Sequence, residues 1–207
     1  MKINRDDILN SILEGVAELD HIQSEELPNI DLYMDQVTTF MEKHLASSKR
    51  YEDDKILTKT MINNYAKNNL LPPPDKKKYS KEHQLLLIFI YYFKNILSIR
   101  DIEKLLKPFS EKYFGTDSAL TLTNIYDEVW NQEPERKAAL MEDLKTIYAT
   151  ASSTFADTPE DDREQLQLFS FICALSFDVY IKKQIIEKLI DEIPDADDKK
   201  DKKEKSK

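Results

Sequence analysis

The sequence predicts an all-α protein, and three observations support this fold class. Only two of the 207 residues are glycine, and apolar residues recur at helical spacing in nearly every segment. No segment shows the alternation typical of a β-strand, apart from a short hairpin candidate at residues 72–78. We therefore expect helices throughout, in a chain long enough to bury a real core.

The first quarter of the chain contains two predicted helices. Apolar residues at helical spacing predict an amphipathic helix at residues 5–19. A second helix is expected at residues 31–45, with Asn29 or Asp31 as its N-cap. Small and charged residues at 46–54 indicate a loop after it.

A short helix predicted at about residues 59–68 has an unusual polar face. Thr58 can cap its N-terminus, and the three prolines at residues 72–74 prevent its continuation. Its apolar residues share one face. The opposite face is expected to carry Thr60, Asn63, Asn64 and Lys67. Amides, hydroxyls and amines are the groups that read base edges in a DNA major groove.

Two further helices are expected before residue 111. Ser80 begins the first, and an unbroken apolar run at residues 85–93 predicts that it is the central buried helix of its domain. Ser98 and Asp101 have the spacing of a capping box, which starts the second helix. Pro108 is expected to end that helix.

The C-terminal half of the chain is acidic. Residues 111–198 hold 20 acidic and 8 basic side chains. Helices are expected to begin near Thr123 and near Pro134, and residues 163–193 form the longest and most apolar predicted helix. The predicted division is therefore a first domain at 1–110, an acidic helical bundle at 111–193 and a disordered charged tail at 194–207.

Four runs of the sequence follow a family pattern, namely Thr58-Lys-Thr-Met-Ile-Asn-Asn-Tyr-Ala-Lys-Asn-Asn-Leu-Leu-Pro-Pro, Tyr79-Ser-Lys-Glu, Phe89-Ile and Leu97-Ser-Ile-Arg-Asp-Ile-Glu-Lys-Leu-Leu. This part of the sequence resembles the second half of a MerR-type winged helix-turn-helix domain, closest to an uncharacterised bacterial branch described only as a domain of unknown function. The resemblance implies an N-terminal winged helix-turn-helix unit followed by a C-terminal helical bundle. Residues 58–68 would be the recognition helix and residues 72–78 the wing.

The sequence departs from the family pattern at several places. Asn63-Asn64 stands where the recognition helix usually has Arg-Tyr, and Asn69 stands where a glycine usually precedes the Leu-Leu pair. The wing is several residues shorter than usual and lacks its Gly-Tyr-Arg. The loop before Thr58 is longer than the usual tight turn.

The charge is unevenly distributed over the chain. The net charge is −9, yet residues 49–81 carry nine basic and four acidic side chains. Such a local basic region can bind phosphate on an acidic protein, whereas the alternative is a solvated loop. The predicted partner is double-stranded DNA. The candidate contact residues are Thr58, Lys59, Thr60, Asn63, Asn64, Lys67, Lys76, Lys77 and Lys78.

No constellation in the sequence indicates catalysis, a cofactor or a metal. His21, His44 and His83 lie in different segments without paired ligands, and we interpret the single cysteine, Cys173, as inert core. Two glycines cannot build a phosphate-binding loop. One cysteine, no signal peptide and no long apolar run predict a cytoplasmic, non-enzymatic protein without a membrane span.

Two functions remain open on these grounds. The first is a MerR-like transcriptional regulator whose acidic C-terminal helices dimerise or sense a small molecule. The second is a non-catalytic protein-interaction module that has lost DNA binding, which Asn63-Asn64 and the short wing favour. For residues 163–193, a homodimer interface and an intramolecular core are both open.

Overall fold

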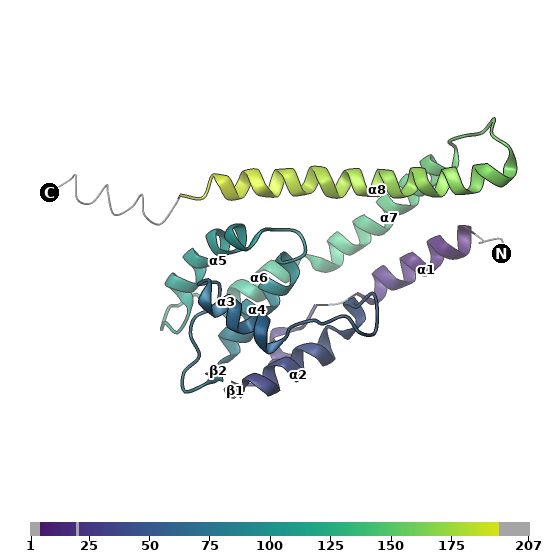
Figure 1. Ribbon diagram of the computed structural model, residues 1–207. Coiled ribbons are helices and arrows are strands. Elements are labelled where there is room, and N and C mark those ends of the chain that lie inside the picture. The colour runs from purple at the N-terminus through teal and green to yellow at the C-terminus, as the bar shows by residue number, and fades with distance from the viewer. Residues whose placement is uncertain (1–4, 20, 195–207) are drawn as a thin grey trace, which may run out of the picture. The chain divides into compact units, whose positions relative to one another are not determined.

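The computed structural model of the chain describes residues 5–19 and 21–194, a range that is mostly helical with one two-stranded sheet (Figure 1). None of the helices in this range has the length and apolar character that a bilayer crossing requires. In chain order the elements are α1 (Arg5–Glu18), the 3₁₀ helix η1 (Ser24–Glu26), β1 (Leu32–Tyr33), α2 (Met34–His44), the 3₁₀ helix η2 (Ala46–Ser48), α3 (Lys59–Lys67), β2 (Lys78–Tyr79), α4 (Lys81–Phe93), α5 (Ile99–Tyr113), α6 (Leu122–Trp130), α7 (Glu133–Ser152) and α8 (Glu160–Asp191).

The chain forms two compact units. The central unit contains residues 22–129 and 185–194, and the flanking unit contains residues 5–19, 21 and 130–184. This division differs from the predicted boundary at residue 110, because almost all of α6 belongs to the central unit and α1 belongs with α7 in the flanking unit. Apart from Pro194, the predicted tail at 194–207 lies outside the described residues.

The sheet of the central unit joins segments far apart in the sequence. Strands β1 and β2 are antiparallel, with Leu32 opposite Tyr79 and Tyr33 opposite Lys78. A further bridge pairs Asp75 with Lys78, so the chain turns back on itself just before β2. The Asp75–Lys78 bridge thus closes a tight turn within the region predicted as a short hairpin. Strand β2, which follows this turn, also pairs with β1, the strand before α2.

The start of α2 differs from the predicted one. Neither Asn29 nor Asp31 caps the helix, which begins at Met34. The backbone of Tyr33 is extended because it is paired in the sheet, and its N–H donates to Gln36 Oε1 at 2.8 Å. Pairing with β2 thus delays the helix, and the Gln36 side chain satisfies a backbone donor at its N-terminus.

The N-terminus of α3 agrees with the sequence-based prediction. The Met61 N–H donates to Thr58 Oγ1 at 3.2 Å, so the threonine caps the helix. Ile62 and Tyr65 are buried, and α3 contacts α2. The helix therefore turns its apolar face into the central unit.

The C-terminus of α3 is a Schellman motif built on an asparagine. Asn69 has φ +57°, in the left-handed region. The Leu70 N–H donates to Tyr65 O at 2.9 Å, and the Asn69 N–H donates to Ala66 O at 3.3 Å. Leu70 and Tyr65 are both buried, as the hydrophobic contact of this motif requires.

Helix α4 is the central helix of the unit, as its apolar run predicted. Its side chains that are at most 1% exposed are Gln84, Leu85, Leu86, Leu87, Ile88 and Ile90. Other fully buried residues of the unit come from α2, α3, α5 and α6, for example Val37, Ile62, Ile102 and Tyr126. The core of the central unit therefore surrounds α4.

The structure corrects the predicted end of α5. The capping box is present, since Ser98 Oγ accepts from the Asp101 N–H at 3.2 Å and Asp101 accepts from the Ser98 N–H at the same distance. Pro108, however, lies inside the helix, which continues to Tyr113. A proline removes one helical hydrogen bond, and the bonding resumes beyond it, as the Phe114 N–H donates to Ser110 O at 3.1 Å.

The flanking unit has a small core of its own. Its buried residues Leu144, Ala151 and Phe171 come from α7 and α8, and α1 adds half-buried side chains, namely Ile12, Leu13 and Val16. Gln167 is buried, and its Nε2 donates to Ser152 O and Thr154 O, both at 2.7 Å. This amide thereby closes the loop between α7 and α8.

Helix α8 displays many large apolar side chains. Those more than 40% exposed are Phe169, Ile172, Phe177, Val179, Tyr180, Ile181, Ile185 and Leu189. Cys173 is exposed as well, which corrects its interpretation as a core residue. The apolar run of α8 surrounds the helix, so one buried stripe cannot accommodate all of it.

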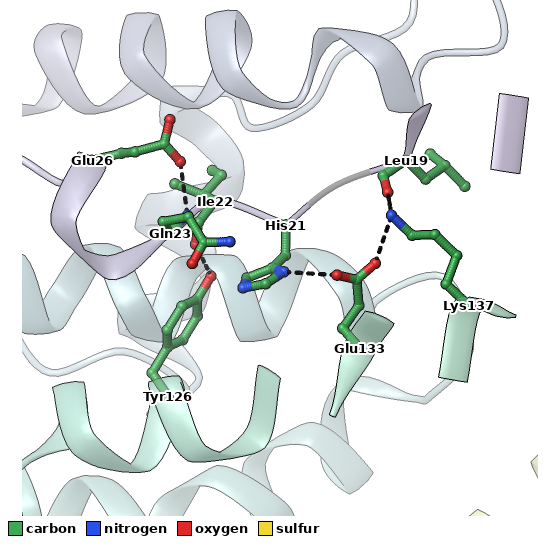
Figure 2. A network of polar contacts seen from close by, with 8 residues as sticks. All are labelled: Leu19, His21, Ile22, Gln23, Glu26, Tyr126, Glu133 and Lys137. Carbon is green, nitrogen blue, oxygen red and sulfur yellow. Dashed lines mark hydrogen bonds and ion pairs between the residues drawn. The ribbon is translucent and has the colours of Figure 1, made fainter. Parts of the chain in front are cut away.

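Polar contacts hold the ends of α1 and α7 in the flanking unit (Figure 2). His21 Nδ1 lies 3.3 Å from Glu133 Oε2, and the His21 ring stacks on Trp130 with centroids 5.0 Å apart. Lys137 forms an ion pair with Glu133 at 2.9 Å and donates to Leu19 O.

Candidate nucleic-acid interface

The outward face of α3 carries the four polar residues that the spacing predicted there. Thr60, Asn63, Asn64 and Lys67 are all exposed. Asn68, just past the helix, donates through Nδ2 to Asn64 O at 2.8 Å, so its amide is engaged with the backbone. The amides of Asn63 and Asn64 form no hydrogen bond to the described part of the chain and face outward.

Thr58 and Lys59, which were also predicted to contact DNA, are engaged within the protein. Thr58 is half-buried and its hydroxyl accepts the capping bond from Met61. Lys59 is exposed and forms an ion pair with Asp35 in the first turn of α2. Both residues therefore have local roles at the N-terminus of α3.

Lys76 and Lys77 occupy an unusual backbone conformation. Their φ values are +45° and +66°, and the Lys78 N–H donates to Asp75 O at 2.8 Å, which together define a type I′ turn. Such turns favour Asn-Gly or Gly-Gly. A left-handed conformation costs an ordinary residue about 1–2 kcal/mol. The turn thus holds two exposed lysines at a backbone cost that glycine would avoid.

The segment that contains this turn and α3 matches the model of a protein family. Residues 22–129 match the model of a domain of unknown function, DUF1836. The chain belongs to the DUF1836 family. No curated protein and no solved structure matches the chain. The matched segment coincides with the continuous part of the central unit, so this DUF1836 domain is a structural unit as well as a sequence unit.

One contact holds the two ends of the DUF1836 domain together. Tyr126 of α6 is fully buried, and its hydroxyl donates to Ile22 O at 2.6 Å (Figure 2). Burial is the main cause that raises the pKa of Tyr126 well above its usual range, so the phenol remains a hydrogen-bond donor.

Lys78 differs from the two lysines before it. It is half-buried in β2, and its Nζ lies 5.4 Å from the ring centroid of Tyr33 on the paired strand. This cation–π contact anchors Lys78 to β1. Among the three lysines, Lys76 and Lys77 are therefore the ones directed to solvent.

His83, in the first turn of α4, contacts the segment that precedes the Lys76-Lys77 turn. Its side chain is buried, and Nδ1 accepts from the Ser80 N–H at 3.0 Å, which leaves the ring proton on Nε2, 3.4 Å from Pro73 O. Burial lowers the pKa of His83, with hydrogen bonds to backbone carbonyls opposing the shift. Sequence reasoning did not assign this role, although the Ser80-x-x-His83 spacing of a capping box was a signal for it.

The charge around the DUF1836 surface is mixed. Asp35 pairs with Lys59, and Asp75 opens the turn that presents Lys76 and Lys77. Lys67 is exposed at the end of α3. Within residues 5–19 and 21–194, no cluster of three or more His, Cys, Asp or Glu side chains is arranged to hold a metal ion.

Proposed function

We propose that the DUF1836 domain of this chain is a MerR-like winged helix-turn-helix module that binds double-stranded DNA, and that the chain is a transcriptional regulator. The order of its elements supports the proposal, because two helices, α2 and α3, come before the turn at residues 75–78, and α4 follows it. In this proposal α3 is the recognition helix. The type I′ turn at residues 75–78 is the proposed wing.

The conformation of Lys76 and Lys77 is the observation that carries the proposal. Two adjacent residues other than glycine in the left-handed region cost stability, and such strain concentrates at functional sites. Lysine at these positions gains nothing from packing, because both side chains are exposed. Two cations at the tip of a short turn are suited to grip a phosphate backbone.

The face of α3 is suited to a different task. An asparagine amide can bond bidentately to the N6 and N7 atoms of adenine, and lysine can meet guanine or phosphate. Asn63, Asn64, Thr60 and Lys67 therefore read bases or adjacent phosphates in this proposal. Thr58 acts by capping the helix, and Lys59 contacts DNA only if phosphate replaces Asp35 as its partner.

A second candidate function is a protein-interaction module on the same scaffold. The pairing of Lys59 with Asp35 and the Asn63-Asn64 pair in place of Arg-Tyr favour it. The exposed apolar side chains of α8 support a partner at residues 163–193. A second copy of the chain fits this role, because MerR-like proteins as a family pair through a C-terminal helix.

A salt-dependent binding assay with the full chain tests the DNA proposal. Fluorescence anisotropy measures binding to a duplex from the region upstream of the protein's own gene and to a shuffled duplex of equal composition. The double variant K76A/K77A should weaken binding to both duplexes alike. It should also make the plot of log affinity against log salt less steep. The magnitude of the negative slope should fall by about 0.9 for each phosphate that the variant no longer neutralises.

Two further variants complete the design. K145A/K182A removes two exposed lysines from the flanking unit and should leave the slope unchanged. N63A should keep the slope, cost about 1–3 kcal/mol on the preferred duplex and relax discrimination at one base position. If the wild-type chain binds neither duplex at low salt, the regulator proposal is wrong and the interaction module replaces it.

A further inference from the structure

An apolar cavity lies within the DUF1836 domain. Its volume is about 140 Å³, and nine side chains from α4, α5 and α6 line it, all of them apolar. They include Phe89 and Phe93 of α4, Leu105 of α5 and Ile125 of α6. The cavity is formed by the matched segment alone, so it does not depend on the flanking unit.

The aromatic wall of this cavity is held in place by its own contacts. The Phe89 ring stacks on Phe93, with centroids 6.0 Å apart and an angle of 12° between the rings. The Phe89 ring also meets the Tyr126 ring edge-on, with 5.4 Å between the ring centroids and 65° between the ring planes. Tyr126 is fixed in turn by its hydrogen bond to Ile22 O. A ligand would therefore meet a wall that is already ordered, which lowers the entropic cost of binding.

The cavity has an exit to the exterior. Two of its lining residues, Phe109 and Val129, are 39% and 54% exposed. Leu86 and Leu122, by contrast, line it and are at most 2% exposed. The cavity thus has a buried floor and an accessible mouth, as a ligand site requires.

We propose that this cavity binds a small apolar molecule of about the size of one aromatic ring. An engineered cavity of about 150 Å³ lined by Leu, Ile and Phe stays dry and takes up benzene. The wholly apolar lining defines the ligand class, because a charged or strongly polar group would lose its hydration without gaining a hydrogen bond. The site stands independently of the proposed DNA contact.

Toluene and benzoate form a matched pair of probes for the full chain. They share a ring but differ in charge. Toluene should shift the methyl NMR resonances of Leu86 and Ile125 in a saturable way and raise the melting temperature, because a ligand that binds only the folded state stabilises it. Benzoate at the same concentrations should do neither.

Filling the cavity should remove the toluene response. We expect L105W to weaken toluene binding at least about tenfold, a loss of about 1.4 kcal/mol. L140W, at an exposed position of α7, should bind like the wild type. I125F fills the cavity from another helix and serves if L105W fails to fold.

Absence of a toluene response in the wild type overturns the proposal. This result is expected if a segment of this chain or a second copy already fills the cavity. An equal response in a folded filling variant overturns the proposal too.

Discussion

The hydroxyl of Tyr126 donates to the backbone carbonyl of Ile22, 104 residues earlier in the chain. These two residues lie at the opposite ends of the DUF1836 domain, and the phenol is fully buried. The bond places α6 in the domain that begins at Ile22. It also supports the aromatic wall of the cavity through the contact of Tyr126 with Phe89.

Y126F should therefore destabilise the domain. The variant keeps the ring but leaves the Ile22 carbonyl without its partner, which costs about 1–3 kcal/mol for a buried group. Urea unfolding followed by circular dichroism measures the change. Y51F, at an exposed position outside α8, is the matched control and should change stability by less than about 0.5 kcal/mol. Equal stability of Y126F and wild type would contradict the role given to this bond.

Asn69 offers a test in which two substitutions should have opposite signs. Its φ of +57° is the conformation that glycine adopts readily at the end of a helix. N69G should stabilise the protein by about 1 kcal/mol, and N69A should destabilise it. Both changes are read as shifts in the midpoint of urea unfolding. Shifts of the same sign would show that the backbone conformation does not control stability there.

The Lys76-Lys77 turn should show a trade-off between stability and binding. K76N/K77G introduces the residues that a type I′ turn favours and should raise stability by about 1–2 kcal/mol. The same variant should lose duplex affinity as K76A/K77A does, because both remove the two charges. K76A/K77A should not gain stability, since alanine retains the strain. Duplex affinity that survives in K76N/K77G would argue against a phosphate-gripping wing.

His83 should make stability depend on pH on the acidic side. Burial lowers its pKa in the folded state below the ordinary value of 6.5, so the unfolded chain binds more protons between the two values. Its contribution is complete above about pH 6.5 and is lost as the pH falls below it. H83Q keeps an acceptor for the Ser80 N–H and should flatten this part of the stability curve. Parallel curves for H83Q and wild type between pH 7 and pH 5, about the range in which histidine titrates, would exclude His83 as the cause.

The exposed apolar side chains of α8 should mediate dimerisation. F169S/F177S replaces two exposed rings and should shift the mass measured by light scattering from dimer toward monomer. L120S replaces one exposed apolar residue outside α8 and should leave the mass unchanged. Even weak pairing is visible at a protein concentration on the order of tens of micromolar. A monomeric mass of the wild-type chain at that concentration would refute the homodimer.

Local signals in the sequence were sufficient for several elements. Thr58 and Ser98 cap helices because each hydroxyl needs only a backbone N–H three residues away, and no distant residue takes part. The exposed positions of Asn63 and Asn64 follow from helical periodicity for the same reason. The burial of α4 followed from its unbroken apolar run.

Tertiary contacts decided the remaining features. Leu32 and Tyr33 form a strand instead of the first turn of α2 because Tyr79 and Lys78, which come much later in the chain, pair with them. The cavity at Phe89 exists only because three helices meet around it. Capping and helical periodicity act over three or four residues, so both can be predicted from a single segment of the sequence. Strand pairing, the Tyr126–Ile22 bond and the cavity depend on which segments meet, and a single sequence does not contain that information in local form.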